Sequence, residues 1–384
     1  MPIVPALAAL RRSILLLVGS GFGLRLDHWP GAQPAAGRIS ANARKKPLLK
    51  GGQMLDQLLS LLRGTACLVL ACVSLSLAQS NSDDPSSSAV PRFGHVFIVV
   101  EENHSFSSVI GSPDMPYLNS LANQYGLATS YFADTHPSIG NYFMLTTGQI
   151  VTNDDDFTDT VTDDNMVRQL LAAGVTWKSY AEDLPWVGYT DGDMYPYFKH
   201  HNPFTYFSDV LNSPDQLNNL VPFSQFSTDL ANNTLPQFSF IVPNVLDDAH
   251  DGSLADADSW LRTNIDPLIQ SPLFQQDGLL VIVFDESFDT DTQNGGGQVA
   301  MVVVSPKAIP GYQSTDFYQH ESTLRLLAQG CGLTHFPGAA DTAPDMFEFF
   351  KGSDAPVGAL VNGAAPDPTA SRTAAPATLV PKQQ

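Results

Sequence analysis

Apolar runs rich in β-branched residues recur along the chain and alternate with segments of helical periodicity. A continuous apolar run is typical of a strand that is buried on both faces of a sheet. Such runs are found at 95–100, 127–132, 176–180, 238–243, 279–284 and 299–304. Helical periodicity follows Ser138 and covers 117–125, 167–173, 223–231, 258–269 and 321–328. The alternation predicts an α/β fold with a largely parallel central sheet flanked by helices.

Polar residues directly follow several of these runs. Glu102 and Asn103 come after the first run, and Asp285 and Glu286 come after the run that ends at Phe284. Since sites in parallel sheets lie beyond the carboxyl ends of the strands, we expect these side chains to converge. Further polar residues in comparable positions are Asp248, His250, Asp251 and His320.

Ser138 stands between a proline and an apolar segment with helical spacing, so it is predicted to lie in the opening turn of a helix. Free backbone N–H groups and the helix dipole make that position favourable for an anion. The amide of Asn141 can reach the same space. Two interpretations are open from these residues alone, namely a nucleophile that attacks an anionic ester and a serine that caps the helix.

The distribution of charge divides the chain near Gln79. Residues 1–78 contain nine basic and two acidic residues, and the remainder contains ten basic and 37 acidic residues, a net charge of −27. This excess of acids disfavours nucleic acid and anionic lipid surfaces as partners. It favours a bound cation wherever the acids converge.

The N-terminal part has the pattern of an export signal. Residues 54–78 contain an apolar run at 66–75 and end at Ala78 in a small-residue cleavage pattern, so they predict a secretory signal peptide. A membrane anchor needs about 18 uncharged apolar residues, and Arg63 leaves this segment too short. Residues 1–53 are interpreted as a leader outside the fold. We therefore expect a secreted or periplasmic protein without a stable membrane anchor.

The rest of the chain divides into three parts. Residues 79–92 are a polar linker, 93–352 the predicted catalytic domain, and 353–384 an Ala-, Pro- and Thr-rich tail that we expect to be disordered. Signal cleavage would leave Cys331 as the single cysteine, so no intrachain disulfide is expected in the mature protein.

The polar residues at the strand ends favour metal chemistry. Glu102, Asn103, Asp285 and Glu286 offer oxygen ligands, which suit a hard divalent cation such as Mg²⁺, Ca²⁺ or Mn²⁺. Such an ion would lower the pKa of the Ser138 hydroxyl and neutralise charge on a phosphoryl group. Each acid taken singly has a simpler interpretation as a solvated side chain.

Histidines supply the second half of the predicted chemistry. His250 and His320 are placed to donate to phosphate oxygens or to protonate a leaving alkoxide. A lone histidine, however, is more often structural, and we interpret His136 beside Pro137 in that way.

One acidic pair is excluded as a calcium loop. Asp289 and Asp291 resemble the start of an EF-hand loop, but Ala300 stands where that loop needs its twelfth-position glutamate.

The segment 99–106 contains E-N-H-S-F and resembles the signature of the metal-dependent phosphoesterases. That family joins acid phosphatases and bacterial phospholipases C and is related to the alkaline phosphatase superfamily. The likeness extends over about residues 93–350. It includes 136–138 with Asn141 and Tyr142, 201–204, 248–251, 284–286 and His320. The resemblance implies an alkaline-phosphatase-like fold.

The resemblance also implies roles for individual residues. Ser138 would be the phosphorylated nucleophile and would share a metal ion with the four oxygen ligands named above. His201, His250 and His320 would bind phosphate or transfer protons, and Asp251 would assist in substrate binding. Asn141 is also implied in substrate binding, although Gly140 before it stands where related enzymes often have proline. No cysteine occupies the nucleophile position, which disfavours the sulfatase branch.

These observations predict an exported, metal-dependent phosphoric ester hydrolase that acts through a phosphoserine intermediate. Small phosphomonoesters are the favoured substrates, and a phospholipase C or another phosphodiesterase is the alternative. The aromatic insertion at 186–206 supports that alternative, because it could line a pocket for a larger leaving group. A secreted cation-binding protein without turnover is the alternative from another class, and the complete set of nucleophile, ligands and histidines disfavours it.

Overall fold

The computed structural model describes residues 90–350. The predicted leader, signal peptide, tail and most of the linker lie outside these residues. Within the described part, no helix has the length and apolar character needed to cross a membrane.

An eight-stranded sheet forms the centre of the described part, in the order β4-β3-β5-β1-β6-β7-β2-β8. Every neighbouring pair is parallel except the two that involve β7, which runs antiparallel to β6 and β2. The largely parallel sheet expected from the sequence is therefore confirmed. The strands are β1 (His95–Glu101), β2 (Gly126–Ala128), β3 (Trp177–Ala181), β4 (Leu220–Pro222), β5 (Phe238–Val242), β6 (Gly278–Phe284), β7 (Met301–Val304) and β8 (Tyr312–Ser314).

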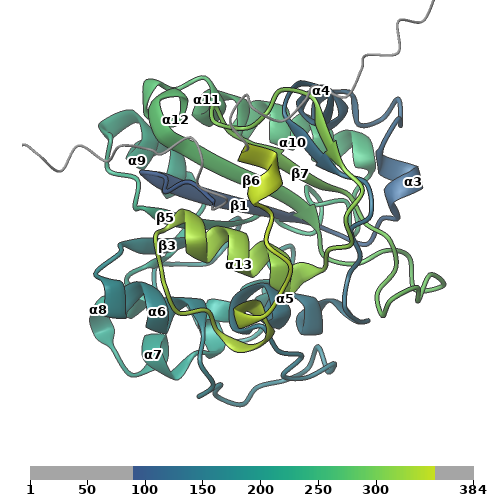
Figure 1. The fold of residues 1–384 in the computed structure, drawn as a ribbon. Helices are drawn as coiled ribbons and strands as arrows, with labels where there is room; N and C mark the ends of the chain where they lie inside the picture. Colours follow the sequence, from purple (N-terminus) through teal and green to yellow (C-terminus); the bar gives the residue numbers. More distant parts are fainter. Residues whose placement is uncertain (1–89, 351–384) are drawn as a thin grey trace, which may run out of the picture. The chain divides into compact units, whose positions relative to one another are not determined.

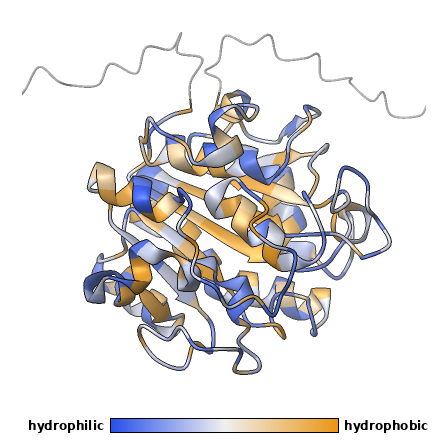
Figure 2. Ribbon diagram, turned by 90° about the horizontal axis from the view of Figure 1, so that it is seen from below, coloured by the Kyte–Doolittle hydropathy of each residue, from blue (hydrophilic) through white to orange (hydrophobic). Residues whose placement is uncertain are grey.

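Helices cover both faces of this sheet (Figure 1). In that view α4, α10, α11 and α12 lie on one side, and α13 and α5 lie on the other. Figure 2 shows the apolar central strands enclosed between the helical layers. The helices are α3 (Phe106–Val109), α4 (Pro116–Gln124), α5 (Ser138–Thr147), α6 (Met166–Ala173), α7 (Ser208–Leu211), α8 (Pro214–Leu217), α9 (Ser224–Asn232), α10 (Leu254–Asn264), α11 (Asp266–Ile269), α12 (Pro272–Asp277) and α13 (His320–Gly330). Short 3₁₀ helices are η1 (Lys199–His201), η2 (Pro203–Tyr206), η3 (Gly338–Asp341) and η4 (Phe347–Phe350).

The two central strands bring the first acids together. All residues of β6 are buried, and β1 is buried from its second residue onward. Their parallel register pairs Glu101 with Phe284, so the next residues, Glu102 and Asp285, emerge side by side. The backbone N–H of Asp285 donates to the carbonyl of Glu101 at 2.9 Å and continues the pairing past the strand ends.

Some element boundaries differ from the expectation. The single helix predicted over 258–269 is two helices, α10 and α11, because Pro267 lacks the N–H needed to continue the first. The strand predicted over 127–132 ends at Ala128, and beyond it Tyr131 and Phe132 form isolated bridges. Strands β4 and β8 were not predicted, since three residues are too short to show a period.

The Gly-rich loop 294–297 packs against the segment that leads to Ser138. A Cβ atom on Gly295 would collide with the carbonyl oxygen of Asp134, and one on Gly296 would collide with that of Thr135. The glycines therefore allow two backbones to approach closely and hold the entry to α5 in place.

Candidate active site

Helix α5 places Ser138 in the core. All ten residues of the helix are buried, and Ser138 is its first residue. Pro137 is the N-cap, and the backbone N–H of Ile139 in the first turn donates to Asp155 Oδ1 at 3.3 Å, so Ser138 caps nothing. The Ser138 hydroxyl instead donates to Glu102 Oε2 at 3.1 Å. The capping interpretation of Ser138 is therefore wrong, and the hydroxyl faces the acids at the sheet edge.

Tyr142 lies one helical turn after Ser138 and faces the same carboxylate. Its hydroxyl donates to Glu102 Oε1 at 2.5 Å, so both oxygens of Glu102 receive a hydrogen bond from α5. Residues four apart lie on one face of a helix, so the spacing of Ser138 and Tyr142 indicates that both face the same space. Tyr142 was given no role of its own in the sequence analysis.

Asn141 is fully buried and connects α5 to the preceding segment. Its Nδ2 donates to the Thr135 carbonyl at 2.8 Å and to Glu286 Oε2 at 3.2 Å. A Cβ atom at Gly140 would collide with Asn153 Oδ1, and Asn153 Nδ2 donates to Thr135 Oγ1 at 2.9 Å. Glycine at position 140 thus leaves room for an asparagine that braces this turn.

Three carboxylates surround the Ser138 hydroxyl. Glu102 and Asp285 are fully buried and Glu286 is nearly so. The Ser138 hydroxyl donates its proton to Glu102 and also lies close enough to Asp285 and Glu286 to lower the pKa of each. The predicted nucleophile and three of the predicted metal ligands therefore share one small volume.

Asn103 completes the predicted ligand set. It has left-handed backbone geometry, with φ of 56°, and its N–H donates to Asp285 Oδ1 at 3.1 Å. The Asn103 Oδ1 and Asp285 Oδ2 atoms are buried without a hydrogen-bond partner. Unpaired buried oxygens are costly unless a cation or a donor satisfies them. The residues present thus fit a hard divalent cation.

The electrostatics agree with this fit. Burial, followed by the nearby Asp285 and Asp248, raises the pKa of Glu102 well above its usual value. Burial also raises the pKa of Asp285 to about 6, and burial together with Asp285 and nearby acids raises that of Glu286 to about 10. Across residues 90–350, no lysine or arginine is hydrogen bonded or ion-paired to these three carboxyls. A bound cation would supply the positive charge that the protein itself does not.

His201 lies behind Glu102. Its Nε2 is 3.4 Å from Glu102 Oε1 and its Nδ1 is 3.6 Å from Asp248 Oδ2, and its ring stacks on that of Tyr142. Burial and the neighbouring histidines lower the pKa of His201 well below its usual value. His201 is placed to orient Glu102, and Asp248 is a further partner that had no assigned role.

His250 and Asp251 lie at the open side of the site. The His250 ring is 5.7 Å from that of His201, and its Nδ1 is 3.1 Å from Asp251 Oδ1. Ligand atoms of Glu102, His201 and His250 all come within 4.8 Å of one another. The His250 side chain is 28% exposed, so it can reach a substrate that enters from solvent.

His320 takes a different position from the other histidines. Its Nε2 is 2.6 Å from the Asp285 carbonyl oxygen and its Nδ1 is 3.0 Å from the Tyr131 hydroxyl. A carbonyl only accepts, so Nε2 carries the hydrogen in this arrangement. Burial lowers the pKa of His320 to about 4. Both ring nitrogens are engaged with protein atoms, and His320 supports the backbone of Asp285.

Comparisons with known proteins bear on this site. Residues 112–334 match the sequence model of the Phosphoesterase family. The phosphatidylinositol-3-phosphatase of Mycobacterium tuberculosis is 35% identical over 268 residues, which cover 69% of this chain and 85% of that protein. A probable acid phosphatase of Kluyveromyces lactis is 29% identical over 306 residues, which cover 77% and 70% of the two chains. A solved protein of the alkaline phosphatase superfamily from Vibrio parahaemolyticus has a TM-score of 0.46 and 13% identity, over 63% of this chain and 67% of that one.

Proposed function

Because the chain belongs to the Phosphoesterase family and is a hydrolase of phosphoric esters, we propose that Ser138 is its nucleophile and forms a phosphoserine intermediate. The observation that carries this proposal is the Ser138 hydroxyl, which caps no N–H of the helix and donates to Glu102 at 3.1 Å. Its place at the N-terminus of α5 also puts the positive end of the helix dipole near an incoming phosphate.

In the proposed reaction the Ser138 Oγ attacks phosphorus in line with the leaving oxygen. The new Oγ–P bond forms as the P–O bond to the alcohol breaks, and the serine proton passes to Glu102 Oε2. His250, oriented by Asp251, gives a proton to the departing alkoxide. A water molecule then attacks the phosphoserine and gives a proton to His250, while Glu102 returns its proton to Ser138 Oγ as the Oγ–P bond breaks, which releases phosphate and restores the hydroxyl.

A divalent ion would be held by Glu102, Asn103, Asp285 and Glu286 together with Ser138. When bound, it would lower the pKa of the serine hydroxyl and neutralise charge on the phosphoryl group. The all-oxygen set favours Mg²⁺, Ca²⁺ or Mn²⁺. His320 and His201 act as positioning residues, the first through the Asp285 carbonyl and the second through Glu102.

Small phosphomonoesters are the proposed substrates. The relatives named above are phosphatases, which supports a monoesterase over a phospholipase C or another phosphodiesterase. A cavity of about 370 Å³ near the N-terminus of α5 is lined by Asp155, Asp156, Asp191 and Asp193 and by Lys199. This acidic lining would repel leaving groups that carry additional negative charge. Export through the signal peptide at 54–78 is part of the same proposal.

The test combines a substrate panel with trapping of the intermediate. We expect kcat/KM for an aryl phosphate monoester to exceed that for its diester and for dispersed phosphatidylcholine by at least about tenfold, or about 1.4 kcal/mol of discrimination. Acid quenching during turnover should leave a phosphate on the peptide that contains Ser138, detectable by mass spectrometry. A preference for the diester or the lipid would overturn the monoesterase assignment. A metal-loaded protein without turnover on any ester would favour the non-catalytic cation-binding alternative.

A further inference from the structure

We propose a second divalent-cation site beside Ser138, formed by His136, Glu286 and Asp289. Ligand atoms of these three residues all lie within 4.8 Å of one another. From the sequence we expect a structural role for His136, and Asp289 is excluded as a ligand of an EF-hand loop. The structure brings the two together from separate segments, one preceding α5 and one following β6.

The orientation of His136 is the main observation. Its Nε2 is 3.0 Å from the backbone carbonyl oxygen of Asp291, and because a carbonyl can only accept, Nε2 carries the ring hydrogen of the neutral imidazole. The lone pair on Nδ1 is then directed at Glu286 Oε2, 3.1 Å away. Nδ1 is buried and receives no hydrogen bond. Histidines that bind metals are commonly held in this manner, with the other ring nitrogen bonded to a carbonyl.

The spacing fits coordination to one ion. Two ligand atoms about 2.1 Å from an ion are about 3.0 Å apart in octahedral coordination and about 3.4 Å apart in tetrahedral coordination. The 3.1 Å between His136 Nδ1 and Glu286 Oε2 lies within this range. A proton shared between His136 Nδ1 and Glu286 Oε2 is the competing explanation for their 3.1 Å separation, and the metal count below distinguishes the two.

The chemistry of the two ligand sets differs. Imidazole with two carboxylates suits borderline ions such as Zn²⁺, Mn²⁺ or Co²⁺, whereas the set around Asn103 contains only oxygen. Glu286 belongs to both sets, because its carboxyl contacts Ser138 and also faces His136. Bridging carboxylates are typical of two-metal sites that hydrolyse phosphate esters. The second ion would therefore lie where it could hold a phosphate oxygen next to Ser138.

Metal stoichiometry tests the site without any need for turnover. After equilibrium dialysis against Zn²⁺ or Mn²⁺, elemental analysis should give about two ions per wild-type chain and about one in Asp289→Asn. Asp159→Asn, which removes an equal charge from the exposed loop after α5, should retain two. The same ion count in Asp289→Asn as in the wild type would overturn the proposal, whatever the occupancy of the site around Asn103.

A spectroscopic experiment identifies the nitrogen ligand. Pulsed EPR of the Mn²⁺-loaded protein should show ¹⁴N coupling from an imidazole, which is lost in His136→Gln and kept in His201→Gln. Loss of the ¹⁴N coupling in His201→Gln alone would show that the nitrogen-ligated ion is bound by Glu102, His201 and His250. That result would overturn the site proposed here. Circular dichroism of each variant separates loss of the ion from loss of the fold. Neither readout depends on ester hydrolysis, so this proposal and the proposed function fail independently.

Discussion

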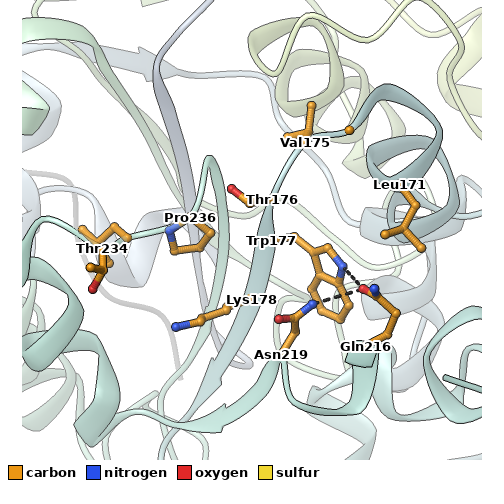
Figure 3. Close-up of a pocket in the computed structure, with 11 residues that line it drawn as sticks. Leu171, Val175, Thr176, Trp177, Lys178, Gln216, Asn219, Thr234 and Pro236 are labelled. Carbon is orange, nitrogen blue, oxygen red and sulfur yellow. Dashed lines mark hydrogen bonds between the residues drawn. The ribbon is translucent and has the colours of Figure 1, made fainter. Parts of the chain in front are cut away.

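The two ends of the parallel strands, called here the amino edge and the carboxyl edge of the sheet, differ in whether their buried polar groups have hydrogen-bond partners. At the amino ends of β3, β4 and β5 lies a cavity of about 590 Å³ (Figure 3). Its polar groups satisfy one another, since Trp177 Nε1 and Asn219 Nδ2 both donate to Gln216 Oε1 at 2.9 and 3.1 Å. At the carboxyl ends, by contrast, buried oxygen atoms such as Asn103 Oδ1 and Asp285 Oδ2 have no hydrogen-bond partner. The proposed catalytic residues therefore lie where buried charge is unsatisfied, and they do not line the cavity of about 590 Å³.

The pKa values of the acids at the two edges are shifted in opposite directions from their usual values. Burial alone would raise the pKa of Asp229, but hydrogen bonds from Lys178, Tyr180 and Gln225 outweigh burial and lower it. At the carboxyl edge burial dominates and raises the pKa of Asp285 to about 6. An acid with a cationic partner stabilises the fold, whereas a group of acids without one costs stability until a cation binds.

Removal of the proposed nucleophile should have the largest effect. We expect Ser138→Ala to lower kcat by several orders of magnitude, because the reacting oxygen is lost. Its melting temperature should change by only a few degrees, since the side chain caps nothing. Ser227→Ala, an exposed serine on α9, is the matched control. Near-normal turnover in folded Ser138→Ala would show that Ser138 is not the nucleophile and that the reaction takes place elsewhere.

Loss of one ligand oxygen should have the next largest effect. Asp285→Asn is expected to lower turnover at least about a hundredfold and to raise the Mg²⁺ or Mn²⁺ concentration needed for half activity, because a charged ligand is lost. Chelation of the wild type should abolish activity, and added ions should restore it. Asp215→Asn on α8 makes the same change away from the carboxyl edge and should alter neither quantity. Full activity in a preparation free of metal by elemental analysis would contradict this expectation.

A substitution at the amino edge should affect stability and leave turnover alone. Lys178 Nζ lies 2.6 Å from Asp229 Oδ2, so Lys178→Met leaves a buried carboxylate with only neutral donors. We expect a loss of about 1–3 kcal/mol in the free energy of unfolding, measured by urea denaturation, with kcat within about twofold of wild type. A large fall in kcat would show that the two edges are coupled and would weaken the contrast between them.

The smallest effect concerns Asp134, which precedes the nucleophile segment. Burial, reinforced by the adjacent Glu321, raises the pKa of Asp134 to about 8. The folded state therefore holds a proton that the unfolded chain releases above about pH 4, so this stability is present in acid and is lost as the pH rises towards 8. Asp134→Asn mimics the protonated form and can still accept the His320 N–H.

Relative to wild type, the melting temperature of Asp134→Asn should rise by a few degrees between pH 5 and pH 8, since about 1 kcal/mol shifts it by about 2–4 °C in a domain of this size. Asp316→Asn, an exposed acid, provides the control and should show no such trend. A constant offset at all pH values would show that Asp134 is already ionised in the folded protein.

Much of the fold could be predicted because the central strands are long, apolar and buried on both faces. The convergence of Glu102, Asp285 and Ser138 followed from their places after strands. The position of His320 could not be predicted, because nothing local reveals that the Tyr131 hydroxyl and the Asp285 carbonyl occupy its ring. The position of His136 was missed for the same reason, since its partners lie about 150 residues away in the chain.

Helix α5 has no solvent-facing side, and this has a consequence for how the enzyme fails. Its backbone amides can exchange with deuterium only when the surrounding helices and the sheet separate, so their protection should equal that of the whole domain. The proposed nucleophile, Ser138, is therefore part of one of the last segments to open. On heating, we expect activity to disappear in the same transition as the fold, with no earlier stage in which the protein is intact but inactive.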